Sequence, residues 1–429
     1  MKKISKVPPH LATRREFLRG SAAAGTGLMA LGAFAPQFVV DTVQAAGSAA
    51  LDKDGKILVL IKLGGGNDGL NTLAPVNDDT YHEFRPNIGI KKSEALMLND
   101  DLGLNPACSG LNELYQNGDL AVIQDVGYPN SSRSHFSGQD FYERGGGLEF
   151  VGSGWLGRYL DSECPQDQLE GRDTPVATHI SRHLPILLRS RTPQPVFSML
   201  SSDVRALQSR SVADDAVAEL LRKTVMAGTE EKTETVNYLN MAYMSALVTE
   251  ERVRDAIGNY KPGATYPGTN LGRDLSAVAS MISDEMGTRV YTLDTGGFDT
   301  HSNQTQRQAQ LLGNLSDSIS AFLSDLKSKG LEDKVIVMPF SEFGRRPYEN
   351  GSNGTDHGSN SVFFVAGSSV NGGIYGNQPV IPTDRRSDLR YSETSTDFRQ
   401  LYATIVDRWL DGNSTDVLRK EYTPVEFLS

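Results

Sequence analysis

Residues 56–69 read Lys-Ile-Leu-Val-Leu-Ile-Lys-Leu-Gly-Gly-Gly-Asn-Asp-Gly, an aliphatic run that passes directly into glycine and polar residues. A run without polar alternation is typical of a strand that is buried on both faces, as in a parallel sheet. The glycines end this strand and place Asn67 and Asp68 in the loop at its carboxyl end. Ligands of open α/β sheets bind at such carboxyl ends.

A second strand-like segment, at residues 288–293, is followed by a loop that carries Asp299 and His301. A carboxylate and an imidazole two residues apart lie on one side of an extended turn, where Zn²⁺ or Mn²⁺ would accept both. The alternative is an Asx-turn whose histidine caps the helix that is expected to start near Gln304.

The third run covers residues 334–340 and leads to Glu342, after which a loop rich in Gly, Asn and Ser carries Asp356 and His357 to another strand-like segment, 361–366. The alternative for this loop is a solvated turn. Carboxyl ends of parallel strands meet at one edge of a sheet, however, so we expect the three clusters to converge. Carboxylates and imidazoles gathered in this way suit a divalent metal ion.

The segment after the strand candidate at residues 120–126 offers a nucleophile. Ser134 lies at the expected junction of this strand with a helix, next to Arg133. A helix N-terminus and a neighbouring arginine stabilise a serine alkoxide and any phosphoryl group attached to it. The alternative is that Ser131, Ser132 and Ser134 are helix N-cap residues.

Five motifs carry a resemblance that covers nearly the whole chain after residue 45. They are Gly-Gly-Asn-Asp-Gly-Leu-Asn at 65–71, Arg-Ser-His-Phe at 133–136, Gly-Gly-Phe-Asp-Thr-His at 296–301, Ser-Glu-Phe-Gly-Arg at 341–345 and Thr-Asp-His-Gly at 355–358. Together, and in this order, they resemble the domain-of-unknown-function family 1501, which is grouped with the alkaline phosphatase and sulfatase superfamily. The resemblance implies a doubly wound, mostly parallel α/β sheet of the alkaline phosphatase type.

The resemblance also implies site residues by matched position. Ser134 resembles the nucleophile, Arg133 or Arg345 would donate to the substrate, and the implied metal ligands are Asp68, Asp299, His301, Glu342 and His357. Glu342 stands where the superfamily has the Asp of an Asp-His pair, and Phe343 follows it in place of the imidazole. The implied cofactor is a divalent metal, zinc above others. The number of ions stays open. The site could hold one ion, with or without Asn67 as a further ligand, or two ions.

The N-terminus predicts export of the chain in its folded state. Residues 13–19, Thr-Arg-Arg-Glu-Phe-Leu-Arg, form a twin-arginine motif, and a weakly apolar stretch at residues 20–40 leads to small residues around Ala45. Residues 1–45 are therefore predicted to be a signal peptide that the twin-arginine translocase reads as a partner. The predicted location is the periplasm or the outside of the cell. No other segment reaches 18 apolar residues, so we expect no stable membrane span.

Charge and cysteine content narrow the function classes. The 429-residue chain has a formal net charge of −11, which becomes about −15 without the predicted signal peptide. An acidic chain of this kind opposes nucleic-acid binding. The two cysteines, Cys108 and Cys164, permit a disulfide outside the cytoplasm but do not prove one. Neither lies in the nucleophile segment, which disfavours a modified-cysteine mechanism.

Strand and helix patterns alternate clearly over about 52–150 and 275–410, which predicts one large α/β domain at residues 46–429. A helical insert is expected at about 195–270. His179 and His183 are interpreted as structural, because the surrounding pattern is strand-like and no acidic ligand lies near. The sequence thus predicts an exported, metal-dependent hydrolase of small or polymeric anionic phosphate or sulfate esters. The alternative is a noncatalytic envelope protein of the same fold that binds a glycan or a protein.

Overall fold

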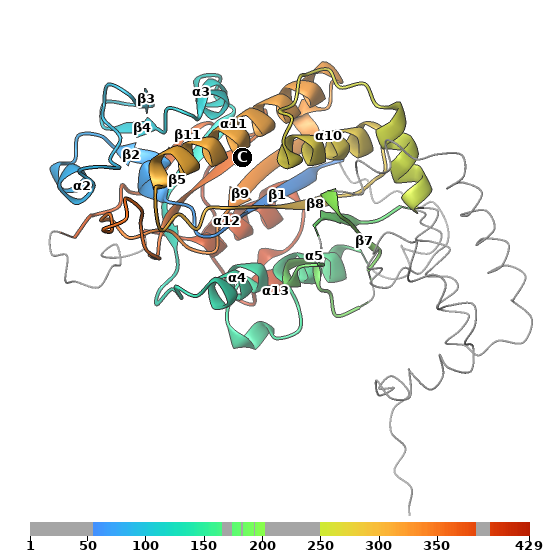
Figure 1. Ribbon diagram of the computed structural model, residues 1–429. Helices are drawn as coiled ribbons and strands as arrows, with labels where there is room; N and C mark the ends of the chain where they lie inside the picture. The colour runs from blue at the N-terminus through green and yellow to red at the C-terminus, as the bar shows by residue number, and fades with distance from the viewer. Residues whose placement is uncertain (1–54, 165–173, 182, 193, 202–248, 383–394) are drawn as a thin grey trace, which may run out of the picture. The chain divides into compact units, whose positions relative to one another are not determined.

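The computed structural model describes residues 55–164, 174–181, 183–192, 194–201, 249–382 and 395–429 (Figure 1). The predicted signal peptide lies outside these residues, and so does the stretch 202–248 of the predicted helical insert. Residues 249–259, at the other end of that insert, are helical.

The central element is a nine-stranded sheet. Along the sheet its strands are β11 (Gly373–Tyr375), β5 (Leu120–Gly127), β10 (Ser361–Ala366), β9 (Val335–Phe340), β1 (Ile57–Gly64), β8 (Val290–Gly296), β6 (Ala177–Ile180) and β7 (Val196–Met199), with β12 (Thr396–Asp397) also paired to β5. A separate small sheet has the order β2 (Leu73–Pro75), β4 (Leu102–Leu104), β3 (Leu96–Met97). The predicted α/β class with a mostly parallel sheet is confirmed.

Strand direction explains why distant segments reach one edge. β1 pairs in parallel with β8 and with β9, and β10 runs antiparallel to β9 and to β5. The carboxyl ends of β1, β5, β8 and β9 therefore lie at the same edge as the start of β10. Each polar cluster predicted from the sequence either follows or precedes one of these strands at that edge.

Helices cover both faces of the sheet (Figure 1). On one face lie α3 (Ser109–Gln116), α10 (Asn270–Ser283) and α11 (Gln304–Ser328), and on the other lie α4 (His135–Arg144), α5 (Trp155–Glu163), α12 (Phe398–Thr404) and α13 (Ser414–Leu418). The remaining helical segments are α2 (Asp79–Phe84), the 3₁₀ turns η2 (Gly69–Asn71), η3 (Leu148–Phe150), η4 (Ile186–Leu188) and η5 (Glu332–Lys334), and the π-helical turn η6 (Ile405–Trp409).

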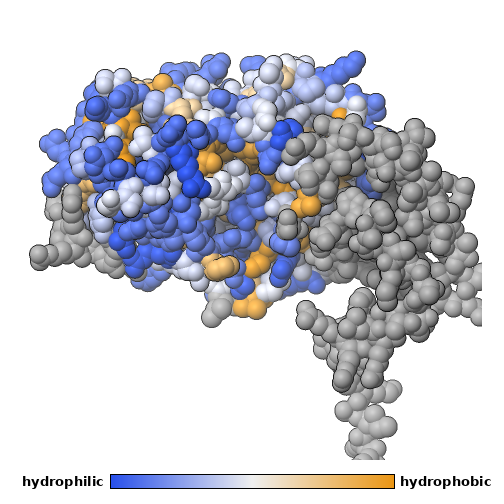
Figure 2. Space-filling model, in the orientation of Figure 1, coloured by the Kyte–Doolittle hydropathy of each residue, from blue (hydrophilic) through white to orange (hydrophobic). Residues whose placement is uncertain are grey.

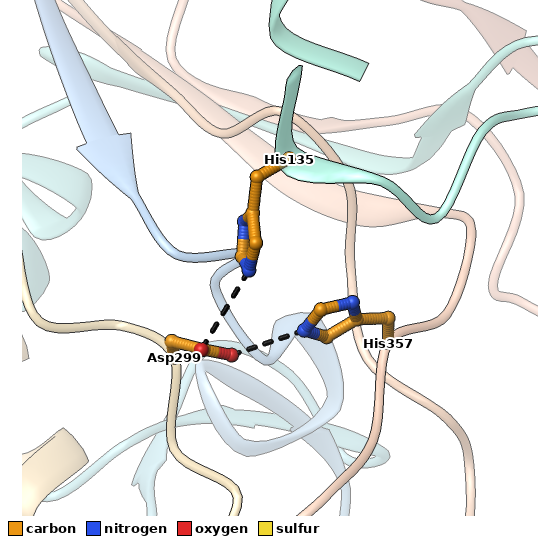
Figure 3. Close-up of side chains that lie close together, drawn as sticks. All are labelled: His135, Asp299 and His357. Atoms are coloured by element: carbon orange, nitrogen blue, oxygen red, sulfur yellow. Dashed lines mark hydrogen bonds and ion pairs between the residues drawn. The ribbon is translucent and has the colours of Figure 1, made fainter. Parts of the chain in front are cut away.

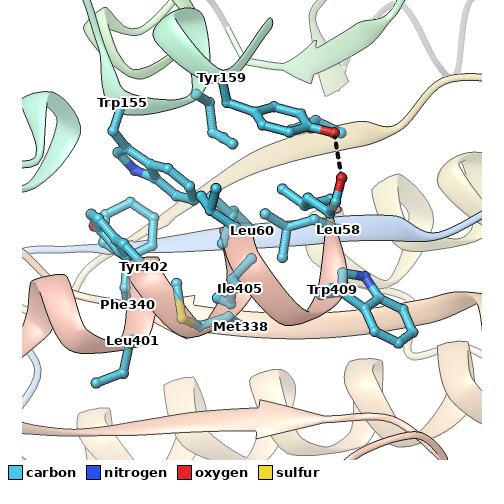
Figure 4. Packing of buried hydrophobic residues seen from close by; sticks show 14 of the residues in the cluster. Leu58, Leu60, Trp155, Tyr159, Met338, Phe340, Leu401, Tyr402, Ile405 and Trp409 are labelled. Atoms are coloured by element: carbon cyan, nitrogen blue, oxygen red, sulfur yellow. Dashed lines mark hydrogen bonds between the residues drawn. The ribbon is translucent and has the colours of Figure 1, made fainter. Parts of the chain in front are cut away.

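The strands form because alternate apolar side chains are buried on opposite faces. Leu58 and Leu60 of β1 contribute to a core cluster with Trp155 of α5 and Tyr402 of α12, whose rings stack with a centroid separation of 4.3 Å (Figure 4). Val59, between the two leucines, is equally buried and points to the opposite face by strand geometry. A rigid sheet buried on both faces holds the edge loops in fixed positions.

Three details differ from the sequence prediction or complete it. β7 belongs to the main sheet although it lies within the range predicted as the insert, so the sheet extends to Met199. The helix α12 continues directly into the π-helical turn η6. Cys108 and Cys164 are both buried and free of a disulfide.

Within the residues that the structure describes, no helix combines the length and apolar character needed to cross a membrane. The face shown in Figure 2 is largely hydrophilic, with scattered hydrophobic residues.

Candidate metal centre

His135, Asp299 and His357 come together at the carboxyl edge of the sheet (Figure 3). His135 is the first residue of α4, Asp299 follows β8, and His357 lies in the loop before β10. One ligand atom from each lies within 4.8 Å of the others. His301 joins them, because its Nε2 lies 3.0 Å from Oδ1 of Asp299. Four possible ligands from three distant segments therefore surround one point.

Glu342 fixes the ring orientation of His135. Oε1 of this carboxylate lies 2.8 Å from Nδ1 of His135 and also accepts from the backbone N–H of Gly65 at 2.8 Å. Since a carboxylate accepts, Nδ1 of His135 carries a proton, and in the neutral ring Nε2 keeps its lone pair. Nε2 lies 3.6 Å from Oδ2 of Asp299.

The other two imidazoles are held in the same way. Nδ1 of His357 donates to the backbone carbonyl of Arg133 at 2.8 Å, and Nδ1 of His301 lies 3.1 Å from Oδ1 of Asp356. Both acceptors leave Nε2 unprotonated in the neutral ring. Hydrogen bonds from the outer ring nitrogen to a carboxylate or carbonyl are the arrangement found around metal-ligating histidines.

The inner atoms are hydrogen-bond acceptors that face one another. Nε2 of His301 and Nε2 of His357 are 3.0 Å apart, and Nε2 of His357 is 3.1 Å from Oδ1 of Asp299. Protonation does not relieve this easily at His357, because burial lowers the pKa of its imidazole, and the nearby Arg345 lowers it further. Imidazole nitrogens and a carboxylate are the donors that Zn²⁺ accepts in a four-coordinate site. The residues present therefore fit a divalent cation.

Arg345 positions Asp299. Its Nη2 donates to Oδ1 of Asp299 at 2.5 Å, its Nε donates to the carbonyl of Gly66 at 2.8 Å, and its Nη1 donates to the carbonyl of Thr355 at 2.8 Å. The side chain is fully buried. Burial raises the pKa of Asp299, but the hydrogen bond from Arg345 and the positive charge of its guanidinium lower it, and the pKa is about 2. The carboxylate is therefore ionised, and Arg345 joins three loops at the edge of the sheet.

Asp68 has a different environment. Both of its carboxylate oxygens pair with Arg85, at 2.6 Å for Oδ2 and 3.0 Å for Oδ1, and Oδ2 also accepts from Gln304 at 2.5 Å. Both side chains of the ion pair are completely buried. Neighbouring Asn67 bonds to Thr72 through its side chain. The structure brings neither Asp68 nor Asn67 into the histidine group.

Phe343 follows Glu342 in the loop after β9. Its ring packs against His135 and His357, with centroid separations of 4.9 and 4.7 Å. Gly66, at φ +79°, lies so close to this ring that a Cβ there would collide with it. Gly65, at φ +124°, similarly leaves no room for a Cβ beside the backbone of Asp299. The glycine run after β1 therefore serves close packing of the loops.

Ser134 is the N-cap residue of α4, and its side chain is exposed and makes no cap hydrogen bond. It directly precedes His135 in the chain, so it lies at the rim of the centre. Arg133, half-buried, contributes its backbone carbonyl to His357.

Of the five metal ligands predicted, the structure gathers Asp299, His301 and His357. Glu342 lies one contact further out, behind His135, and Asp68 is paired with Arg85. Sequence reasoning did not assign a role to His135, although it stands inside the Arg-Ser-His-Phe motif beside Ser134. A histidine at the start of a helix that follows a core strand was the signal that could have identified it.

Comparison with known proteins gives a family and distant structures. The family model described as "Protein of unknown function (DUF1501)" matches residues 55–410. No curated protein matches the sequence.

Three solved structures are similar at low identity. The C-terminal periplasmic domain of EcEptC from Escherichia coli, in complex with Zn, is 9% identical over 78% of this chain and 77% of that chain, with a TM-score of 0.36. The PsFucS1 sulfatase from Pseudoalteromonas sp. is 11% identical over 76% and 65%, with a TM-score of 0.33. The phosphonate monoester hydrolase of Agrobacterium radiobacter is 9% identical over 86% and 78%, with a TM-score of 0.29. Since the three TM-scores lie below 0.5, these superpositions carry no weight for the function of this chain.

Proposed function

The chain belongs to the DUF1501 family, and we propose that it is an exported, metal-dependent hydrolase of phosphate or sulfate esters. The observation that supports this proposal most is the orientation of three imidazoles. Each has Nδ1 engaged by an outer acceptor, and in His135, His301 and His357 alike Nε2 faces Asp299. Metal-ligating histidines donate their outer ring N–H to a carboxylate, a carbonyl or water and present the other ring nitrogen to the metal, and all three imidazoles are held in that way.

We assign the metal to His135, Asp299 and His357, with His301 as a further ligand. Zinc fits best, since three imidazoles and one carboxylate match its preferred donors and its coordination number. A bound divalent ion supplies positive charge that stabilises a developing oxyanion and lowers the pKa of a coordinated oxygen. Glu342, Asp356 and the carbonyl of Arg133 hold the rings in the ligating orientation, and Arg345 holds Asp299.

Ser134 is the proposed nucleophile. Attack of its Oγ on phosphorus or sulfur forms a covalent ester with the protein and breaks the bond to the leaving oxygen, and water then hydrolyses that ester. The position of Ser134 at the N-terminus of the ten-residue helix α4 favours negative charge on the transferred group. Arg133, next in the chain, is the proposed donor to the nonbridging oxygens. Arg345 has a positioning role instead, because it is buried against the three loops.

The proposed substrate is an anionic ester outside the cytoplasm. Export rests on the twin-arginine motif around Arg14 and Arg15 and on the apolar stretch that follows it. Replacing both arginines by lysine is expected to keep the precursor in the cytoplasm, which cell fractionation would show. Normal export of the double variant would remove this part of the proposal.

The decisive experiment compares Ser134→Ala with Ser137→Ala, an exposed serine one turn along α4. Zinc-loaded protein is assayed with aryl phosphate, aryl phosphodiester and aryl sulfate. Loss of the nucleophile is expected to lower kcat/KM at least about 1,000-fold, which corresponds to roughly 4 kcal/mol of barrier. Because Ser134 makes no cap hydrogen bond, the variant is expected to unfold at the wild-type denaturant concentration.

Other outcomes point to other functions. If Ser131→Ala or Ser132→Ala abolishes turnover instead, the nucleophile is wrongly assigned, and if no serine matters, the covalent mechanism is wrong. A folded protein that binds no metal and hydrolyses none of the esters would favour the noncatalytic alternative, in which the fold binds a glycan or a protein partner.

A further inference from the structure

A sealed polar unit lies beside the proposed metal centre and takes no direct part in it. The unit consists of Asp68, Arg85 and Gln304, each no more than 1% exposed. Arg85 pairs with both oxygens of Asp68 and is held in turn by the side chain of Asn71 at 2.7 Å and by the carbonyl of Pro347 at 2.8 Å. A buried carboxylate is stable only when paired and hydrogen-bonded in this way.

Gln304 connects this unit to both loops that carry the proposed ligands. Its Nε2 donates to Oδ2 of Asp68, and its Oε1 accepts from the hydroxyls of Thr300 and Thr355, at 3.0 and 2.6 Å. Thr300 stands between Asp299 and His301. Thr355 directly precedes the Asp356-His357 pair. One amide therefore holds the two ligand loops at a fixed separation.

We propose that the centre binds one metal ion per chain, and that the Asp68–Arg85–Gln304 unit takes the place of a second ion as the element that positions the ligand loops. This inference rests on the proposed metal centre. Asp68 acts through Gln304 and is a positioning residue, as is Gln304 itself. Arg85 supplies the positive charge that Asp68 needs inside the protein.

The physical reason is competition for the same oxygens. A cation that ligated Asp68 would have to displace a two-point guanidinium contact and leave Arg85 charged, buried and without its carboxylate. Breaking a buried pair in that manner costs several kcal/mol, as mutational loss of one partner does. Phe343 adds to this, because its ring lies against His135 and His357 where a further imidazole would be needed.

The test is the zinc stoichiometry and affinity of the chelator-stripped protein, measured by calorimetry and checked by elemental analysis. We expect one zinc per chain in the wild type. Gln304→Met, which keeps the volume and removes the hydrogen bonds, is expected to bind zinc about 10- to 100-fold more weakly with an unchanged stoichiometry of one. The matched control is Gln308→Met, one helical turn further on.

Gln308→Met is a strict control, because Gln308 is buried like Gln304, bonds to the carbonyl of Asp68 and accepts from Nε2 of Gln304 at 3.0 Å, but contacts neither ligand loop among the hydrogen bonds of the described residues. A general loosening of α11 would weaken zinc binding in both variants equally, and that result would overturn the positioning role. Two zinc ions per wild-type chain would overturn the one-ion assignment.

The proposed activity and this inference fail in different ways. Wild-type protein that binds one zinc ion and hydrolyses no ester would remove the activity and leave this inference in place. Wild-type protein that binds two ions and hydrolyses the esters would support the proposed activity and overturn this inference. If the wild type binds no zinc, both the metal centre and this inference are wrong.

Discussion

Asp68 and Asp299 follow neighbouring parallel strands, β1 and β8, and each pairs with a buried arginine, yet the two carboxylates have opposite environments. Asp68 is sealed, with a side-chain exposure of 0% and both oxygens on Arg85. Asp299 has a side-chain exposure of 44%, and three imidazoles face it. The same place in the sheet thus produces a structural ion pair in one loop and an open group of proposed metal ligands in the next.

The difference shows what separates a structural carboxylate from a ligand. Arg85 binds both oxygens of Asp68 in a fork, which satisfies the charge completely. Arg345 donates to Oδ1 of Asp299 and to the backbone carbonyls of Gly66 and Thr355, while Oδ2 of Asp299 faces His135. An arginine beside a carboxylate can therefore either neutralise its charge or only fix its orientation.

The largest expected effect lies in the sealed region. Asp68→Ala should lower the free energy of unfolding by about 3–5 kcal/mol, because Arg85 keeps a buried charge without its partner. Denaturant unfolding of the variant and the wild type measures this difference. The double variant Asp68→Leu/Arg85→Met removes both charges. Its loss of unfolding free energy should be much smaller than the summed losses of the two single variants. A loss of unfolding free energy below about 1 kcal/mol for Asp68→Ala would show that water reaches the Asp68–Arg85 pair in solution.

Much of the fold could be predicted from the sequence, because β1, β9 and β10 are largely apolar runs and β5 and β8 begin with strand-like residues. Each run ends in glycine or polar residues, so the edge that carries the ligands follows from the strand direction. The contrast between Asp68 and Asp299 could not be predicted. Arg85 lies 17 residues beyond Asp68 in a segment without a distinctive pattern, and only packing brings it there.

The role of His135 was hidden for a similar reason. Sequence shows that a histidine is present but not which ring nitrogen is engaged, and here that depends on Glu342, 207 residues away. Glu342 itself was predicted to be a ligand, and the structure instead places its carboxylate behind the imidazole. Residue type and strand position predicted which loops come together, whereas the order of contacts among their side chains required the tertiary structure.

The second expected effect concerns a sealed histidine. His179 on β6 is buried, with Nδ1 bonded to Thr292 at 2.8 Å and Nε2 without a partner among the described residues. Burial lowers its pKa to about 4, and Lys62 lowers it too. The folded pKa lies below the unfolded value of about 6.5, so folding favours the neutral imidazole. The stability that depends on a neutral His179 is therefore fully present above pH 6.5. It is lost as the pH falls from 6.5 to 4, by about 3 kcal/mol in all.

His179→Leu should therefore flatten the dependence of unfolding free energy on pH between 6.5 and 4, relative to the wild type. The control is His183→Leu, at an exposed position four residues further on. Equal slopes for wild type and His179→Leu would mean that water reaches this imidazole in the folded state.

The smallest of the three effects lies in the open region, at the outer contact of a ligand. Asp356 accepts from Nδ1 of His301 at 3.1 Å and pairs with Arg346 at 3.4 Å. Asp356→Asn keeps an acceptor but removes the charge that makes the imidazole a stronger base. Zinc affinity should fall about 10-fold, or roughly 1.4 kcal/mol, at the low end of such outer-contact changes. Competition with a chelating dye measures it, and Asp140→Asn on α4, an equal change of charge at a surface pair with Arg144, is the control. If both variants bind zinc as tightly as the wild type, Asp356 does not hold His301 in the metal-bound protein, and His301 is no longer proposed as a ligand. Asp299 would then differ from the buried Asp68 by its exposure alone.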